Sequence, residues 1–334
     1  MLDGRGDVAV ASLTITPDRE ARVAFVRGKE NRVDELLVTH ATIKDIATLD
    51  DLAGRTVHVL AGSSYAEHLR RLNERLVAGG KQAVEIKEAD YHLATEDILE
   101  MVNAGVVKIT VVDDFRARPW AKVLPDIRVH DEVKVHAGGT LGWAVRKDNP
   151  LLRQSLESAA PGFRAGTRIG NTLMRRYFQN TRWIKNPISA GERAKLERLV
   201  ELFKRYGDKY GFDWLALAAQ GCQESTLDHS VKSPAGAVGI MQVLPSTARD
   251  PVVGIADIST VENNIHAGAK YLAFLRRHYF DGPELTDEDR LAFCWAAYNA
   301  GPGNVNRMRR KTKTLADLSA ARRQAVGSGH PAKV

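Results

Sequence analysis

The sequence predicts two domains of different class, an α/β domain followed by a mainly helical domain. The chain has 334 residues, which is more than one ordinary domain needs and enough to bury two separate cores. In its first half, short apolar runs rich in β-branched residues alternate with amphipathic stretches. In its second half, apolar residues recur every three or four positions, which is typical of helices packed on a core.

The first half reads as a series of strands, each followed by helical sequence. Strands are predicted at 7–15, 33–39, 56–60, 83–87, 107–112 and 141–146, and helices at about 65–77, 95–103, 149–158 and 166–179. Because strands alternate with helices, we expect a mostly parallel sheet. Ser63 and Ser64 lie between a strand and a helix, where backbone N–H groups can hold an anion.

A linker over 183–187 separates the halves, because Pro187 interrupts helix continuity. Ser189 and Glu192 have the spacing of a capping box at the start of a long amphipathic helix. Further helices are predicted to begin after Asp213, at Pro245, over about 261–277, and after the cap Thr286. We therefore expect an α/β domain over 1–183, a helical domain over 187–310 and a basic tail over 311–334.

The chemistry of the second domain centres on Glu224, near the start of the stretch 220–248. It lies at the C-terminal end of an apolar, Ala-rich helix, where partial negative charge and apolar neighbours both disfavour ionisation. We therefore expect its pKa to be raised, which suits a general acid. Pro and Gly residues then form a tight loop that leads back to Gln242.

Three blocks of this domain resemble the lytic transglycosylases of the goose-lysozyme-like superfamily. They read E-S-x-x-D, S-x-x-G-A-x-G-I-M-Q-V-x-P-S-T-A and W-A-A-Y-N-A-G-P-G-N-V, in the family's order, and the resemblance covers about 187–310. It implies a lysozyme-like fold in which Glu224 is the only catalytic carboxylate and neither metal nor cofactor takes part. It also implies that the saccharide cleft is lined by Ser233, Gln242, Tyr298 and Asn299. The chain departs from the family at His229 and Val231, where Pro and Ala are usual.

The resemblance implies cleavage of the MurNAc–GlcNAc β-1,4 bond of peptidoglycan without water, giving 1,6-anhydro-MurNAc ends in cell-wall turnover. Most glycosidases need two carboxylates, but attack by the sugar's own C6 hydroxyl removes the need for the second. Glu224 would act first as acid and then as base. Asp228 is the nearest alternative partner, and we expect it to be a surface residue.

In the first domain, the segment LTITPDREARVAFV resembles the T-x-T-x-x-R segment of periplasmic solute-binding proteins for amino acids. The resemblance implies that Thr14 and Arg19 hold a ligand's carboxylate, since the guanidinium fork binds carboxylates bidentately. It implies that Asp113, or Asp114 beside it, binds the amine of an amino acid, a peptide or a muropeptide. A βα unit that precedes residues 2–7 in that family is absent, so we expect an incomplete first lobe and weak binding.

The net charge of +7 favours an acidic partner, either nucleic acid, an anionic membrane or a wall polymer. No nucleic-acid recognition motif is present, so we expect no nucleic-acid partner. The basic residues after Val305 either contact a polyanion or are simply solvated. Both cysteines, Cys222 and Cys294, lie in apolar helical sequence and are predicted to pack in the core.

No signal peptide, lipobox or transmembrane run is recognisable in the sequence. The order of the two domains is similar to that in Gram-negative cell-wall enzymes. These enzymes act in the periplasm and associate peripherally with the outer membrane. Two alternative functions stay open. One is a hydrolytic goose-type lysozyme, and the other is a catalytically silent sensor that binds a solute or muropeptide.

Overall fold

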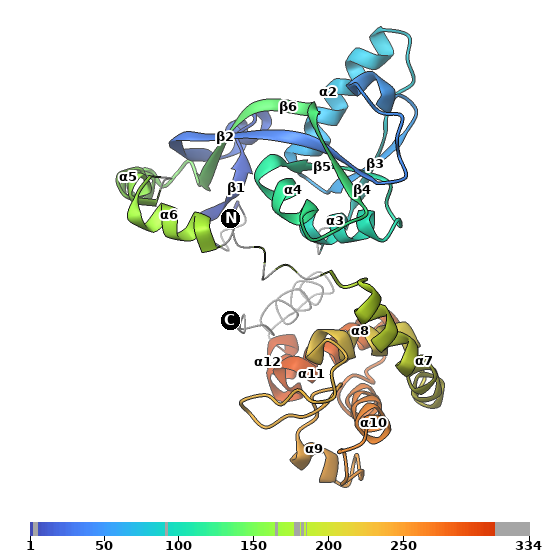
Figure 1. Cartoon of the computed structure of the whole chain (residues 1–334). Helices are drawn as coiled ribbons and strands as arrows, with labels where there is room; N and C mark the ends of the chain where they lie inside the picture. The colour runs from blue at the N-terminus through green and yellow to red at the C-terminus, as the bar shows by residue number, and fades with distance from the viewer. Residues whose placement is uncertain are drawn as a thin grey trace. The chain divides into compact units, whose positions relative to one another are not determined.

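A computed structural model describes residues 1–2, 6–90, 93–163, 166–176, 181, 184 and 186–310. The chain divides into two compact units, Met1–Pro187 and Ile188–Val334 (Figure 1). The end of the predicted helix 166–179 and the basic tail 311–334 lie outside the described residues. The predicted classes are confirmed, since the first unit is α/β and the second is mainly helical.

The first unit is built on a six-stranded sheet with the order β1-β6-β2-β5-β3-β4. Its strands are Val8–Thr14 (β1), Ala24–His40 (β2), Thr56–Leu60 (β3), Glu85–Ala89 (β4), Ile109–Asp113 (β5) and Ile127–Val145 (β6). Among the described residues, the pairings of β3 with β4 and with β5 are parallel, whereas β6 pairs antiparallel with β1 and β2, and β2 pairs antiparallel with β5.

The expectation of a mostly parallel sheet is therefore wrong. The reason is the length of β2 and β6, which have 17 and 19 residues and run antiparallel to each other through the middle of the sheet (Figure 1). Register shifts interrupt their pairing at several points, and such bulges break the alternation by which a strand is recognised in sequence. The sequence therefore revealed only the most apolar part of each strand.

Helices cover both faces of this sheet. They are Pro17–Arg22 (α1), Ser64–Ala78 (α2), Thr95–Asn103 (α3), Asp114–Ala121 (α4), Pro150–Ala159 (α5) and Arg168–Met174 (α6), with two short 3-10 turns, Leu49–Leu52 and Ala160–Phe163. Successive residues of β5 point to opposite faces. Val111 joins the core beneath α2, whereas Val112 joins the core with α3 and α4.

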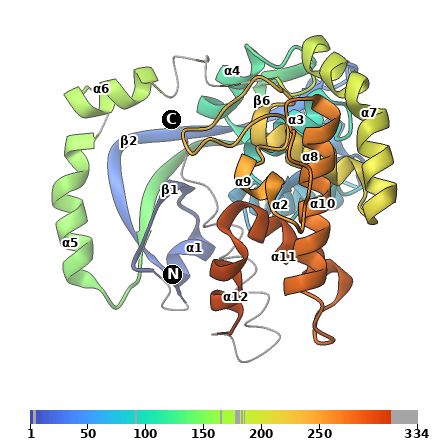
Figure 2. The same ribbon diagram turned by 90° about the horizontal axis from the view of Figure 1, so that it is seen from below.

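The second unit packs its helices around one core. They are Ala190–Tyr210 (α7), Trp214–Ser225 (α8), Pro245–Arg249 (α9), Val261–Tyr279 (α10), Asp287–Ala300 (α11) and Pro302–Arg310 (α12). Phe203, Phe280 and Phe293 are almost fully buried in this core. The helices α10, α11 and α12 lie side by side (Figures 1 and 2).

The helix caps that the sequence predicts for this unit are present in the structure. The side chains of Ser189, Asp213 and Thr286 each accept a hydrogen bond from a backbone N–H in the first turn of their helix. Glu192, however, forms an ion pair with Lys195 at 2.9 Å, so its carboxylate binds a side chain of the same helix. In the described part of the chain, no helix has the length and apolar character that crossing a membrane requires.

The two cysteines differ in their surroundings. Cys294 is buried, and burial raises the pKa of its thiol to about 12. Cys222 is exposed, so its predicted core position is wrong. The buried face of α8 runs through Leu217, Gly221 and Ser225, and a residue one position further along a helix points about 100° away from that face.

Candidate active site

Glu224 occupies the last turn of α8, and the backbone reverses direction directly after it. Thr226 and Leu227 follow in the left-handed region, with φ of 57° and 56°, which non-glycine residues adopt at a cost. Gly221 lies one turn before the end of the helix, and a Cβ there would come within 2.9 Å of Ile240. A glycine at 221 therefore lets the returning loop approach the helix that carries Glu224.

Side chains of α8 and α10 hold the returning loop against the helices. Ser225 Oγ donates to the carbonyl of Ile240 at 2.9 Å. Asn264 of α10 accepts from the N–H of Met241 through Oδ1 and donates to the carbonyl of Val238 through Nδ2, each at 2.9 Å. The loop beside Glu224 is thus fixed by hydrogen bonds to its backbone.

Tyr298 of α11 adds another contact, because its hydroxyl donates to the carbonyl of Met241 at 2.7 Å. Burial, and then the negative charge of Glu224, raise the pKa of Tyr298 well above its usual value. Tyr298 is therefore an uncharged hydrogen-bond donor, and it interacts electrostatically with Glu224. The Glu224 side chain is half-buried and accepts a hydrogen bond from Gln220 Nε2 at 2.8 Å through Oε1.

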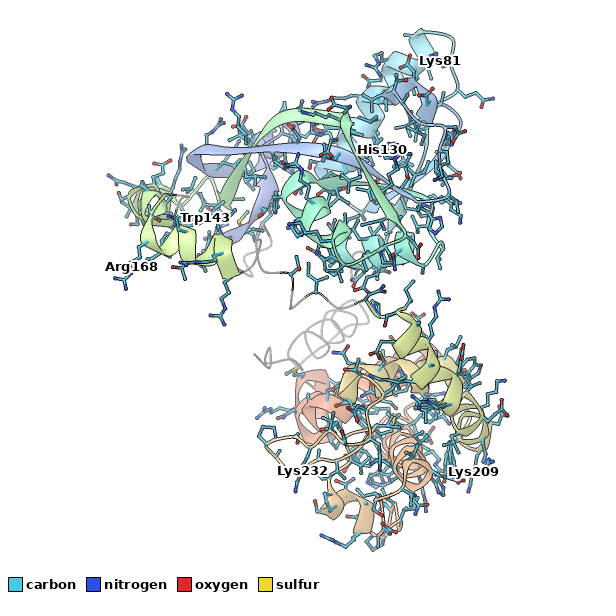
Figure 3. The ribbon with its side chains drawn as sticks, in the orientation of Figure 1. Lys81, His130, Trp143, Arg168, Lys209 and Lys232 are labelled. Carbon is cyan, nitrogen blue, oxygen red and sulfur yellow. The ribbon has the colours of Figure 1, made fainter. Side chains whose placement is uncertain are left out.

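The other predicted cleft residues make mainly local contacts. Gln242 has a left-handed φ of 46°, and its Nε2 donates to the carbonyls of Val231 and Gly239 at 3.0 and 2.8 Å. Ser233 Oγ accepts from the backbone of Ala237 at 3.0 Å within the turn; Lys232, labelled in Figure 3, shows where this turn lies in the second unit.

Asn299 is exposed, and its Nδ2 donates to the carbonyl of Trp295 one turn earlier on α11, at 3.2 Å. Of the predicted cleft residues, Gln242 and Tyr298 thus hold the loop next to Glu224, Ser233 shapes its turn, and Asn299 lies at the helix end next to Tyr298. Their contact with a saccharide stays a prediction.

Asp228 and His229 belong to the loop's own scaffold. Asp228 Oδ1 accepts from the N–H and the hydroxyl of Ser230 at 2.9 and 2.7 Å. These hydrogen bonds lower the pKa of Asp228 below its usual value, so it is an ionised turn residue. His229 Nε2 donates to the carbonyl of Ser259 at 2.7 Å, and the carbonyl of Val231 accepts from Gln242. The two positions that depart from the family pattern, His229 and Val231, therefore take part in hydrogen bonds that fix the loop.

The predicted ligand residues of the first unit fall into two groups. Thr14 is buried, and its carbonyl accepts from Arg19 at 2.8 Å. Arg19 also donates to the carbonyl of Gly62, in the turn between β3 and α2, at 3.1 Å. Ser63 Oγ accepts from Ala66 and caps α2. Arg19 thus ties α1 to the turn where an anion-binding nest was predicted.

Asp113 ends β5 and is 3% exposed. It pairs across the sheet with Glu35, which is fully buried, and in the described residues one oxygen of each carboxylate has no hydrogen-bond partner. Burial, and then the negative charge of Glu35, raise the pKa of Asp113 to about 7. Asp114 is more exposed and pairs with Arg118 at 3.0 Å. Asp113 is therefore the more buried of the two, and its other oxygen, Oδ2, lies 3.8 Å from Arg116 Nε.

The family model described as "Transglycosylase SLT domain" matches residues 201–320. The membrane-bound lytic murein transglycosylase F of Desulfosudis oleivorans is 33% identical over 93% of this chain and 66% of its own length. That of Alcanivorax borkumensis is 30% identical over 90% of this chain and 63% of its own length. Residues 201–320 belong to the transglycosylase SLT domain family. The chain spans about three fifths to two thirds of the length of these relatives.

Among solved structures, an ancestral arginine-binding protein bound to arginine overlaps 53% of this chain and 74% of its own, with 24% identity and a TM-score of 0.44. The substrate-binding protein of an amino acid ABC transporter overlaps 54% of this chain and 74% of its own, with 20% identity and a TM-score of 0.43. These overlaps are partial, and the fold of the first unit rests on its own strand order.

Sequence reasoning missed two residues of the SLT domain that hold the site together, Gln220 and Asn264. Gln220 precedes Glu224 by four residues in a predicted helix, and this spacing alone places two side chains next to each other. Asn264 lies 23 residues beyond Met241 along the chain. No local pattern announces that contact, because it depends on how α10 packs against the loop.

Proposed function

We propose that the second unit cleaves the MurNAc–GlcNAc β-1,4 bond of peptidoglycan without water and leaves 1,6-anhydro-MurNAc ends. The observation that carries this proposal is the placement of Glu224 in the matched SLT domain. It is half-buried at the end of α8, accepts a hydrogen bond from Gln220, and lies near a loop that Asn264 and Tyr298 hold.

One carboxylate is sufficient for this reaction. Glu224 gives its proton to the glycosidic oxygen as the C1–O bond breaks, and the resulting carboxylate then takes the proton of the C6 hydroxyl as O6 bonds to C1. No atom is added, and the enzyme ends protonated as it began. Asp228 is bound by Ser230 within its own turn, which favours a mechanism that does not use it as a second base.

Mass spectrometry of purified peptidoglycan digested by the chain tests this proposal, because anhydro ends lack one water relative to reducing ends. We expect anhydro-muramyl products from the wild type and none from Glu224→Gln. Reducing ends as the main product would instead support a goose-type lysozyme, which needs room for water beside a second base. Glycan binding without any cleavage would support the catalytically silent sensor.

We further propose that the chain works on periplasmic peptidoglycan during wall turnover and associates peripherally with the outer membrane. The relatives are named as membrane-bound, and the net charge of +7 suits anionic wall or membrane partners. Fractionation of cells that express the natural gene tests this proposal, and recovery of the protein only in the cytoplasm would contradict it.

For the first unit we propose a ligand with a carboxylate and an amine, such as an amino acid, a peptide or a muropeptide. The support is the hydrogen bond from Arg19 to the carbonyl of Thr14 beside the Gly62 turn, together with the buried carboxylate of Asp113, of which Oδ1 has no hydrogen-bond partner among the described residues. Calorimetric titration with amino acids and muropeptides should show at most weak binding, and Arg19→Ala should abolish it. Arg22→Ala, an exposed change on the same helix, should bind as the wild type does.

A further inference from the structure

We propose that a cavity in the first unit, where β2 begins and β6 leads into α5, binds a phosphate monoester. The two strands are antiparallel and Ala24 lies opposite Val145, so the start of β2 adjoins the end of β6. The cavity has a volume of about 350 Å³, which lies within the range of ligand-binding pockets. Its described lining comes from α1, from the start of β2, and from the segment that joins β6 to α5.

The lining of this cavity is strongly cationic. Four of its side chains carry a positive charge, and they are Arg27, Arg146, Lys147 and Arg153. Among the described lining residues, the one carboxylate is that of Glu20. A cavity lined mainly by one sign of charge raises the local concentration of the opposite ion. The cavity therefore favours an anion, and one with more than a single charge.

The ion pairs of two of these arginines leave them able to bind such an anion. Arg146 pairs with Asp7 and Asp148 at 3.0 and 3.2 Å, and Arg153 pairs with Glu157 at 2.8 Å. None of these three acids is among the described lining residues, and their side chains are between 45% and 76% exposed. Exposed ion pairs are weak, so a more highly charged anion can replace them.

The other two cations have different partners. Arg27 forms an ion pair with Glu20, in which both side chains are about half-exposed. Lys147 donates to the carbonyl of Ala21 at 2.8 Å, which is an uncharged partner. A phosphate monoester carries about 1.5 to 2 negative charges at pH 7, and its three oxygens suit the guanidinium fork. It therefore competes with Glu20 for Arg27 and can neutralise a second cation.

The remaining part of the lining favours an ester over inorganic phosphate. Val23 and Phe25 line the cavity and are 8% and 4% exposed, so they offer an apolar wall to carbon groups. Asn149 caps α5 by accepting from the N–H of Leu152 at 3.3 Å, and the start of this ten-residue helix adds partial positive charge. The volume exceeds that of a phosphate group, because a water molecule takes only about 30 Å³.

Calorimetric titration of the 334-residue chain with glycerol 3-phosphate tests the proposal. We expect binding that Arg146→Gln weakens about tenfold, because charge-assisted hydrogen bonds are lost. Lys147→Gln, at an exposed position, should weaken it in the same direction and covers the case in which the change at 146 disturbs folding. Glu20→Gln removes the competing carboxylate and should tighten binding about threefold. Arg22→Gln, an exposed change on α1 outside the described lining, should bind as the wild type does.

A phosphate monoester can come from a soluble metabolite or from a lipid headgroup, and vesicles distinguish the two. The chain is sedimented with phosphatidylcholine vesicles that contain phosphatidic acid, and with vesicles that contain the same share of phosphatidylglycerol, whose phosphate is a diester. A preference for phosphatidic acid that Lys147→Gln abolishes supports the headgroup. Binding of glycerol 3-phosphate without this preference supports a free ester.

The proposal is overturned if the wild type binds neither glycerol 3-phosphate nor phosphatidic acid vesicles. Equal binding by the wild type, Arg146→Gln and Lys147→Gln would also overturn it, because the phosphate would then bind elsewhere on a chain of net charge +7. Loss of binding in Arg19→Ala together with full binding in Arg146→Gln would place the phosphate at the Gly62 turn, which again contradicts the proposal. None of these measurements depends on cleavage of peptidoglycan.

Discussion

At the residue scale, the proposed reaction requires Glu224 both to give and to take a proton, and an amide of the same shape can do neither. Glu224→Gln should therefore keep the fold and the affinity for glycan while it lowers cleavage by at least about 10²-fold. Sedimentation with insoluble peptidoglycan measures the affinity, and chromatography of released muropeptides measures the cleavage. Digestion at the wild-type rate would show that another residue is the acid.

Tyr298 and Gln242 are expected to act through the loop that they hold. Tyr298→Phe removes the donor to the buried carbonyl of Met241, and Gln242→Ala removes two donors to loop carbonyls. Each change should cost about 1–3 kcal/mol in activation or unfolding free energy. Steady-state kinetics and thermal unfolding measure these costs. Unchanged values for both variants would place the cleft elsewhere, and Tyr279→Phe on α10 serves as the matched control.

At the scale of elements, Asn264 joins α10 to the loop that follows α8. The side chain is fully buried, and both its amide oxygen and its nitrogen bond to backbone groups of that loop. Asn264→Ala leaves an N–H and a carbonyl unpaired, so it should destabilise the second unit by about 2–4 kcal/mol. Thermal unfolding should show a lower Tm for Asn264→Ala and little change for Asn263→Ala. Equal loss in both variants would contradict the role of this link.

The pairing of β2 with β5 makes the stability of the first unit depend on pH. Asp113 has a pKa of about 7 in the folded chain and an ordinary value of 3.8. The folded state therefore binds more protons between these values, so the contribution of Asp113 to stability is fully present below about pH 4 and is lost as the pH rises through 7. The loss is on the order of 4 kcal/mol, because each unit of pKa difference corresponds to about 1.4 kcal/mol.

Hydrogen exchange of the β2 and β5 amides, measured between pH 5 and 8, can follow this loss after correction for the intrinsic pH dependence of exchange. Protection should fall as the pH rises in the wild type. Asp113→Asn removes the charge and should flatten the dependence. A wild-type profile without slope would mean that Glu35 and Asp113 do not share the low-dielectric site that their burial indicates.

At the scale of the whole molecule, we propose that the second unit is independent in folding. Residues 188–310 contain a core of their own, with Phe203, Phe280 and Phe293 almost fully buried. Expressed alone, this segment should unfold in one cooperative transition, which circular dichroism during heating can follow. A segment without a transition would show that the first unit is needed for its stability.

The sequence by itself determined the features that depend on neighbours three or four residues apart. The predicted bounds of β3 and α3 agree with the structure, Ser189, Asp213 and Thr286 cap the helices they were expected to cap, and Glu224 ends its helix as expected. These features could be predicted because helix caps, helical periodicity and strand alternation are local rules.

Only the tertiary structure decided which distant segments meet. It set the antiparallel course of β2 and β6, the facing of Glu35 and Asp113 across two strands, and the outward position of Cys222. It also brought Asn264 and Tyr298 to the loop beside Glu224. Such contacts join residues that are tens of positions apart in the chain. They depend on the packing of whole elements, and no short pattern in the sequence records that packing.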